Sequence, residues 1–174
     1  MVAHGVDPTV LESIRCPDEA ATVAVAQGLA AQLVGGEVIL LEGDLGAGKT
    51  FFVRALARAL GLDPSIPVTS PTFALVHEYP ETRLPLLHAD LYRLSDPDEL
   101  LYLDIAERLG VAPWVAAIEW GLALSESLGS PDVLIRLRST GETERMLTFE
   151  ALSDHGRSLL DALDGLLERS LGGD

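Results

Sequence analysis

Short apolar runs along the chain alternate with longer segments in which apolar residues recur every three or four positions. The continuous apolar runs at 37–43 and 114–120 are typical of strands that are buried on both faces of a sheet. The segments 18–34 and 49–60 have helical periodicity, and Asp18 is the expected N-cap of the first of these helices. Strands and helices that alternate in this way predict an α/β domain.

The rest of the chain also has recognisable patterns. The expected elements are an opening strand at 8–16, a hairpin of strands at 72–79 and 83–92, a helix at 96–110, an antiparallel pair at 132–139 and 144–151, and a final helix after residue 154 with leucines on one face. Two hairpins added to alternating strands and helices predict a mixed sheet.

A glycine-rich segment, GDLGAGKT at 43–50, lies between a predicted strand and the helix that begins at Lys49. It matches the phosphate-loop pattern G-x-x-x-x-G-K-[ST], in the strand and helix context that this pattern requires. Glycines let successive backbone N–H groups turn inward, and the N-terminus of the helix adds its positive dipole end. Lys49 would reach the β- and γ-phosphates of a nucleotide, and the Thr50 hydroxyl would ligate Mg²⁺. The nucleotide-binding residues predicted here are Gly43, Asp44, Leu45, Gly46, Ala47, Gly48, Lys49, Thr50 and Phe51.

With this loop, the expected architecture is a P-loop NTPase-type three-layer α/β fold. Its sheet is predicted to be mixed and mainly parallel, with a C-terminal antiparallel hairpin. At this length, residues 1–174 are expected to form a single P-loop ATPase domain.

The charge balance is strongly acidic, with a formal net charge of −15 and an isoelectric point of about 4.5. Contacts from Lys and Arg to phosphate dominate nucleic-acid affinity, so the chain is not expected to hold RNA or DNA alone. Of its 12 basic residues only Lys49 is a lysine, and that lysine lies in the phosphate loop. Since a compact ammonium differs from a planar guanidinium, the sequence predicts a locally positive phosphate site on a negative protein.

The identity of the base follows from the same composition. An N-K-x-D sequence, which reads guanine in GTPases, needs a second lysine, and the chain has none. The expected ligands are therefore ATP and ADP together with Mg²⁺.

Two acidic residues end apolar strands of the predicted sheet: Asp90 ends LPLLHAD, and Glu119 ends WVAAIE. Ligands gather at the carboxyl ends of strands in such sheets. Phosphoryl transfer needs an acid near the metal and a group that positions the nucleophile. The predicted catalytic residues are Lys49, Asp90 and Glu119, and the predicted metal ligands are Thr50, Glu119 and Asp90. The spacing leaves open which carboxylate touches Mg²⁺ directly.

Several further positions are candidates for the site. The segment Ser70–Thr72 either senses the γ-phosphate or forms only a Ser-Pro turn. Trp120 either stacks on a base or partner, or belongs to the core. Arg145, on the C-terminal hairpin, is a candidate phosphate contact, and His88 is predicted to pack on the strand face that it shares with Asp90.

A cytoplasmic location is expected. Cys16 is the only cysteine, so an internal disulfide is impossible and a reduced thiol is predicted. No apolar stretch reaches about 18 residues, so neither a membrane span nor a membrane partner is expected. The first residues also lack the basic and then apolar pattern of a secretory signal.

Four stretches occur in one order along the chain: GDLGAGKT, TSPTFALVHEY, HADLYRL followed by DPDEL, and IEWG. In this order and size the chain resembles the bacterial TsaE family, formerly called YjeE, over residues 17–150. Many kinases and ATPases share the first stretch but not the other three. The resemblance implies a small ATPase that is required for forming threonylcarbamoyladenosine beside the anticodon of tRNA. It also implies that the protein docks on the TsaB–TsaD complex and meets tRNA only through that complex.

The resemblance implies roles for the phosphate and metal residues as well. The loop 43–50 would hold the phosphates, with Thr50 and Glu119 as ligands of Mg²⁺. Asp90 would be the second carboxylate, which orients water or the metal shell.

Further residues would complete the nucleotide pocket by the same resemblance. Ser70–Thr72 would be a switch-like segment, and Trp120 would lie near the nucleotide. The start of the first helix, Asp18 to Thr22, would help to form the pocket. Phe51 stands where a second threonine is common in the family, and it is expected to pack.

Two other functions are compatible with a phosphate loop. A small metabolite kinase would need an arginine-rich lid and an acceptor site, whereas the arginines here are scattered. A non-hydrolytic docking module would need nucleotide binding but no catalysis. For the ATPase, slow intrinsic turnover is expected, because the sequence identifies no arginine finger.

Overall fold

The computed structural model describes residues 13–171, so residues 8–12 of the predicted opening strand lie outside the described part. The strands are β1 (Ile14–Cys16), β2 (Val38–Glu42), β3 (Val76–Tyr79), β4 (Leu86–Asp90), β5 (Val115–Glu119), β6 (Val133–Ser139) and β7 (Arg145–Ala151). The helices are α1 (Glu19–Gln32), α2 (Lys49–Ala59) and α3 (Asp154–Leu171), with two 3₁₀ helices, η1 (Pro97–Leu103) and η2 (Leu122–Leu128).

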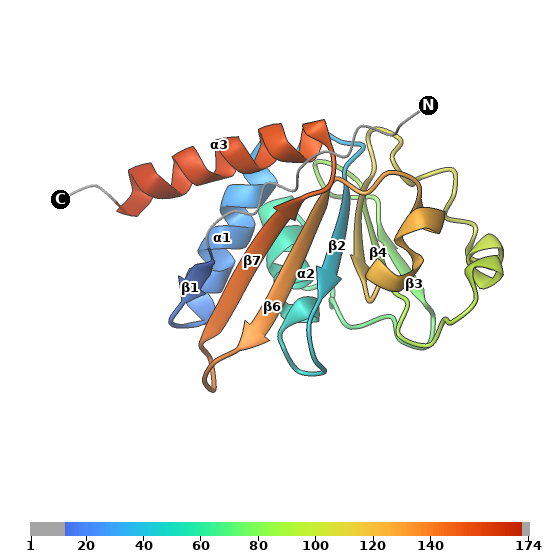
Figure 1. The fold of residues 1–174 in the computed structure, drawn as a ribbon, viewed down its shortest axis with the longest axis horizontal. Coiled ribbons are helices and arrows are strands. Elements are labelled where there is room, and N and C mark those ends of the chain that lie inside the picture. Colours follow the sequence, from blue (N-terminus) through green and yellow to red (C-terminus); the bar gives the residue numbers. More distant parts are fainter. Residues whose placement is uncertain (1–12, 172–174) are drawn as a thin grey trace, which may run out of the picture.

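The strands form one seven-stranded sheet in the order β1-β7-β6-β2-β5-β4-β3 (Figure 1). Its four central strands, β6, β2, β5 and β4, run parallel to one another. Antiparallel strands flank them on both sides, and β3–β4 and β6–β7 are the two predicted hairpins. The predicted α/β fold with a mixed sheet is therefore confirmed.

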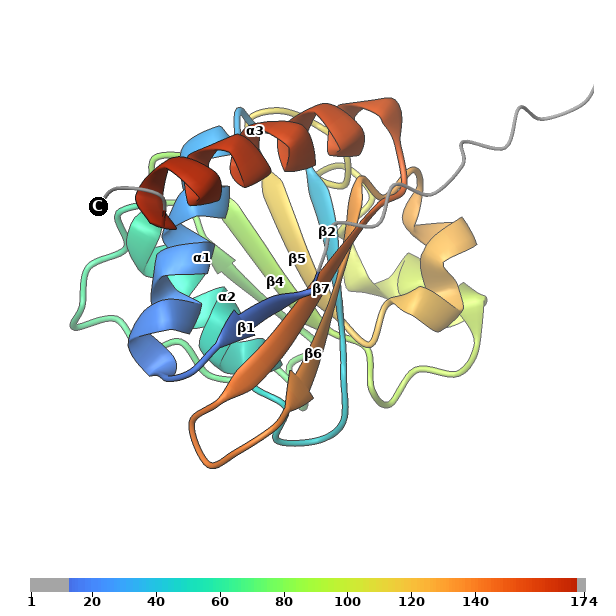
Figure 2. The same cartoon turned by 60° about the vertical axis from the view of Figure 1, so that its left-hand side comes forward.

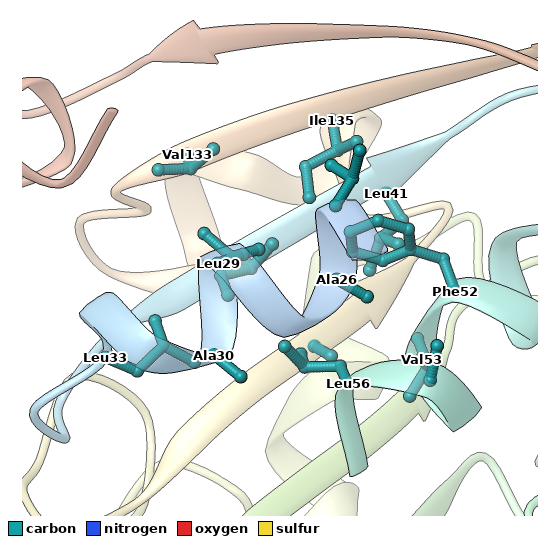
Figure 3. Close-up of a cluster of buried hydrophobic side chains, with 14 of the residues drawn as sticks. Ala26, Leu29, Ala30, Leu33, Leu41, Phe52, Val53, Leu56, Val133 and Ile135 are labelled. Carbon is teal, nitrogen blue, oxygen red and sulfur yellow. The ribbon is translucent and has the colours of Figure 1, made fainter. Parts of the chain in front are cut away.

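Side chains of β2 alternate between two hydrophobic cores. Ile39 and Leu41 pack with the three α-helices, whereas Val38 and Leu40 pack on the other face of the sheet. Figure 2 shows the α-helices on one side of the sheet and η2 on the other. Figure 3 shows the helix-side core, in which residues of α1 and α2 meet β2 and β6. Both faces are covered, which explains why the central strands read as continuous apolar runs.

Helix α1 begins as predicted but ends earlier. The Asp18 carboxylate accepts a backbone N–H of the first turn at 2.8 Å, which is the expected N-cap. The helix ends at Gln32, two residues before the predicted end. Beyond it, the Glu37 carboxylate accepts the N–H groups of Val34 and Gly35 at 2.8 and 2.9 Å, so a loop replaces the last helical residues.

The segment 72–75 is a turn, and the prediction that it begins a strand is wrong. Leu75 has a φ of 66°, and its N–H donates to the Pro71 carbonyl oxygen at 2.5 Å. The strand β3 starts only at Val76. Hydroxyl groups at the beginning of this turn bond to the carboxylate of Asp90. Hydrogen bonds to Asp90, and not strand pairing, therefore set the backbone conformation here.

The helix predicted at 96–110 is present only over its first half, and it is not an α-helix. Pro97–Leu103 is a 3₁₀ helix, and it ends at Asp104, which has a φ of 51°. Leu100 and Ile105 are both buried in the second core. Five positions apart, they would point to different sides of a straight α-helix. The chain bends between them, so that both side chains reach the sheet.

The final helix is confirmed as α3, which packs on α1 and β7. Three of its leucines, Leu159, Leu160 and Leu163, are buried in the helix-side core. The helix thereby closes the side of the sheet that carries α1 and α2 (Figure 1).

Candidate functional site

The loop between β2 and α2 has the backbone curl that a phosphate loop requires. Gly43, Gly46 and Gly48 have φ angles of 151°, 79° and 104°, which favour glycine. A Cβ on Gly43 would lie 2.4 Å from the carbonyl oxygen of Leu137, and one on Gly48 would lie 3.2 Å from Nε of Arg145. The loop therefore fits against β6 only with glycine at position 43, whereas at position 48 the left-handed φ favours glycine and the contact is with a flexible side chain.

Lys49 begins α2, and its ammonium is buried beneath the loop, with 5% of the residue exposed. Its Nζ donates to the carbonyl oxygens of Gly43 and Asp44 at 2.5 and 3.0 Å, and it lies 4.2 Å from the ring centroid of Trp120. Among the described residues it forms no ion pair. Burial lowers the pKa of Lys49, and nearby carboxylates, Glu119 foremost, partly oppose this. The ammonium is thus held by neutral acceptors inside a negative field.

Glu119 ends β5 and is buried. Its Oε1 accepts hydrogen bonds from the Thr50 hydroxyl and from Nε2 of His88, each at 2.8 Å. His88 is fully buried, so the packing predicted for it is present, together with a hydrogen bond that was not predicted. Side chains from α2, β4 and β5 therefore meet at one carboxylate oxygen.

Asp90 ends β4 and lies opposite Glu119 in the parallel register of β4 and β5. Its Oδ2 accepts the hydroxyls of Ser70 and Thr72 at 2.5 and 3.0 Å, and its Oδ1 accepts the N–H of Tyr92 at 3.0 Å. Ser70–Thr72 thus leads into the turn at 72–75, and its hydroxyls bind a carboxylate of the site, while its sensing of a γ-phosphate stays a prediction.

A cavity of about 350 Å³ lies over these side chains, within the size range of small-molecule sites. Its lining residues are Leu45, Gly46, Gly48, Lys49, Thr50, Phe51, Ser70, Thr72, Asp90, Tyr92, Glu119 and Trp120. Trp120 lines the cavity and is only half-buried, which favours the ligand-facing interpretation over the core.

Tyr92 is the one residue of this lining that the sequence did not predict. Its ring lies 5.0 Å from that of Trp120, and its only signal in the sequence is its place two residues after Asp90.

A smaller cavity of about 70 Å³ shares Gly48 and Phe51 with the first. Its other lining residues are Glu19, Thr22, Thr143 and Arg145. Asp18 lines neither cavity, because its carboxylate caps α1. The structure thus brings Arg145 and the start of α1 to the edge of the phosphate loop, where Glu19 and Thr22 of the expected range Asp18 to Thr22 line the smaller cavity and Asp18 does not.

Three of the predicted loop residues do not line the main cavity. Gly43 and Asp44 border a separate cavity of about 470 Å³ on the side of β6 and β7, while their carbonyl oxygens hold Lys49. Ala47 is buried within the loop, and its N–H donates to the Asp44 carbonyl oxygen at 3.0 Å. These residues shape the loop and do not face the space above it.

The donors near Thr50 suit Mg²⁺, which prefers hydroxyl, carboxylate and phosphate oxygens. The predicted ligands Thr50 and Glu119 are in contact, and Asp90 lies on the neighbouring strand. Within residues 13–171, no group of three or more His, Cys, Asp or Glu side chains could hold a metal ion. A cation here would therefore need further oxygens, which nucleotide phosphates supply in such sites. The residues fit a metal–nucleotide complex and not a bare metal ion.

A parallel central sheet, a glycine loop after its middle strand and a buried lysine at the helix N-terminus define a P-loop protein. The family model "Threonylcarbamoyl adenosine biosynthesis protein TsaE" matches residues 16–147, and the chain belongs to this family. The resemblance noted from the four sequence stretches is therefore confirmed.

Relatives and a solved structure agree with this assignment. The tRNA threonylcarbamoyladenosine biosynthesis protein TsaE of Bacillus subtilis is 38% identical over 147 residues, which are 84% of this chain and 89% of the relative. The protein of the same name from Aquifex aeolicus is 38% identical over 137 residues, or 78% and 93% of the two chains. The crystal structure of Bacillus subtilis YdiB is 32% identical with a TM-score of 0.73, and the match covers 92% of this chain and 97% of that one.

The structure also bears on the expectation that no membrane span is present. In the part of the chain that it describes, every helix is too short or too polar to cross a lipid bilayer.

Proposed function

We propose that this TsaE-family chain hydrolyses ATP with Mg²⁺ and thereby supports the formation of threonylcarbamoyladenosine in tRNA. The observation that carries the proposal is the position of Lys49. The only lysine of the chain is buried at a cavity of about 350 Å³, between a phosphate loop and two adjacent strand-end carboxylates. The relatives that match most of the chain are named for this tRNA modification.

Binding of the nucleotide would use the loop and the start of α2. Backbone N–H groups and the helix dipole attract phosphate at such a position. Lys49 now donates to two carbonyl oxygens, and phosphate oxygens would replace these neutral acceptors with charged ones. Because burial disfavours its ammonium, Lys49 gains more from an anionic ligand than an exposed lysine would.

Hydrolysis would use the oxygen ligands on the two strand ends. Thr50, Glu119 and Asp90 are the residues that would hold Mg²⁺, which neutralises charge on the β- and γ-phosphate oxygens when bound. The two carboxylates would also orient a water for in-line attack on the γ-phosphate. The γ-phosphoryl group passes to that water, and ADP and inorganic phosphate leave.

The isolated chain is proposed to turn over slowly. No arginine lines the main cavity within the described residues, and Arg145 lines only the smaller one. An arginine that neutralises the transferring phosphoryl group is often supplied by a partner. We propose the TsaB–TsaD complex as that partner, in the cytoplasm, with tRNA reached only through the complex. A chain with a net charge of −15 has no need to bind RNA itself in this arrangement.

The proposal is tested by measuring phosphate release and tRNA modification with the same protein preparations. Wild type should release phosphate from Mg·ATP, and faster with TsaB–TsaD present. Glu119→Gln and Asp90→Asn should each slow release by about 100-fold, while calorimetry still detects Mg·ATP binding. Phosphate that appears on a metabolite would instead indicate a kinase. Repeated rounds of tRNA modification with the inactive variants would show that binding alone drives the cycle.

A further inference from the structure

His88 is a buried imidazole whose presence packing alone does not explain. It is 0% exposed, and its one hydrogen bond joins Nε2 to Oε1 of Glu119 at 2.8 Å. Its Nδ1 has no hydrogen-bond partner among the described residues. A buried polar atom without a partner costs free energy, and an apolar side chain at this position would avoid that cost. What the histidine adds is therefore the bond to Glu119.

The register of the sheet brings these two residues together. In the parallel pair β4–β5, His88 lies opposite Ala117, and Asp90 lies opposite Glu119. Side chains two residues apart along a strand share one face. His88 consequently reaches Glu119 from the neighbouring strand, while Thr50 reaches the same oxygen from α2.

The two carboxylates of the site differ in the oxygens that they leave unbonded. Hydroxyls of the Ser-Pro-Thr turn and a backbone N–H occupy both oxygens of Asp90. On Glu119, the hydroxyl of Thr50 and the imidazole of His88 share Oε1. No donor among the described residues bonds to Oε2 of Glu119, and Glu119 is one of the residues that line the main cavity. Of the four carboxylate oxygens, Oε2 of Glu119 is therefore the one that accepts no hydrogen bond within the described residues.

We propose that His88 is a positioning residue: its Nε2–H fixes the Glu119 carboxylate so that Oε2 is presented to the metal–nucleotide complex. The inference rests on the proposed function, and it concerns how Glu119, one of the two carboxylates assigned there to Mg²⁺ and its water, is held in place. Glu119 is also the carboxylate with the largest electrostatic effect on Lys49. Without His88, only the Thr50 hydroxyl would hold the Glu119 carboxylate, which could then turn toward that ammonium and compete with phosphate for it.

Three variants test the role of the hydrogen bond. His88→Leu should lower kcat by about 10- to 100-fold, as is usual when an outer partner of a metal ligand is lost. His88→Gln keeps a side-chain N–H donor and should restore most of kcat. His77→Leu, opposite His88 in the register of β3 and β4, is the matched control and should leave kcat unchanged. An unchanged kcat in His88→Leu, or equal losses in both His88 variants, would overturn the proposal.

A double variant separates positioning from general damage to the fold. If His88 acts through Glu119, combining His88→Leu with Glu119→Gln should cost no more than Glu119→Gln alone. Multiplied losses would overturn the proposal. Thermal unfolding of each variant identifies any loss of fold, and His88→Gln remains informative where His88→Leu is unstable.

A spectroscopic readout is independent of ATP hydrolysis. The chain has only four histidines, so the imidazole signals in a ¹⁵N NMR spectrum are few and easily separated. The signal that disappears in His88→Leu is that of His88. A proton on Nε2, with a signal that shifts in Glu119→Gln, is expected. A ring protonated at Nδ1 would overturn the inference alone. If wild type shows the expected Nε2 signal but hydrolyses no ATP, the proposed function is overturned and the position of His88 is not.

Discussion

Lys49 is charged and buried at once, and its partners are carbonyl oxygens and an aromatic ring. A buried charge without a carboxylate partner destabilises a fold. Lys49→Met should therefore abolish binding of Mg·ATP and raise the melting temperature of the nucleotide-free chain by about 2–4 °C. Calorimetry and thermal unfolding measure the two effects. A variant that melts well below wild type would show that the lysine stabilises the loop.

The same lysine predicts a pH dependence of definite sign. Burial lowers the pKa of Lys49 in the folded chain, so the unfolded chain keeps this proton to a higher pH. Between the two pKa values, the unfolded state binds more protons, and the free energy of unfolding rises with pH. Wild type should have a lower free energy of unfolding than Lys49→Met, and this deficit should shrink as the pH approaches the ordinary lysine pKa of about 10.4. Denaturant unfolding at several alkaline pH values measures this deficit, and a deficit that grows with pH would contradict the assignment.

Single residues of the site could be predicted only where a local sequence pattern indicates them. The loop lysine and the two strand-end carboxylates each follow a pattern that is visible within a few residues. The bond from His88 to Glu119 and the contact of Tyr92 with Trp120 depend instead on strand pairing and backbone turns. A shift of one residue in register would point each strand side chain to the other face. The sequence does not state that register, so these contacts had to be observed.

The glycines of the phosphate loop differ in how much space their surroundings leave for a side chain. A Cβ on Gly43 would meet the backbone oxygen of Leu137 at 2.4 Å, whereas one on Gly46 would have no atom within 4 Å. Gly43→Ala should lower the free energy of unfolding by about 2–4 kcal/mol, because the backbone must move. Gly46→Ala is the matched control and should cost about 1–2 kcal/mol, from its left-handed φ alone. Denaturant unfolding of both variants measures the difference, and equal costs would show that the loop is not tightly fitted against β6.

Elements with a continuous hydrophobic pattern were predicted closely, and elements shaped by distant contacts were not. The apolar runs at 37–43 and 114–120 correspond to β2 and β5 within two residues at either end. At 72–75 the backbone is turned by bonds to Asp90, which is remote in sequence. At 96–110 the chain bends to bury side chains against the second face of the sheet. Both errors arise where tertiary structure overrides local preference.

At the scale of the whole molecule, the order of strands creates the site. The alternation of strands and helices predicts the α/β class, but it does not say that β2 lies between β6 and β5. That order places the loop after β2 beside the ends of β5 and, one strand further, β4. Asp90 and Glu119 thus adjoin the phosphate loop although they are far from it in sequence. The sequence could predict only that both residues end strands.

The net charge of −15 acts on the whole molecule. Like charges repel one another more in the compact chain than in the unfolded one, and salt screens this repulsion. Raising NaCl from about 10 mM to about 150 mM shortens the screening length from about 30 Å to about 8 Å. The melting temperature of the nucleotide-free chain should rise by about 2–5 °C over this range and then level off. Replacing Asp161 and Asp164, both exposed on α3, by Asn should make the rise smaller. A rise that continues linearly toward 1 M salt would indicate a general salt effect on hydrophobic burial instead, and a fall would show that attractive ion pairs outweigh the repulsion.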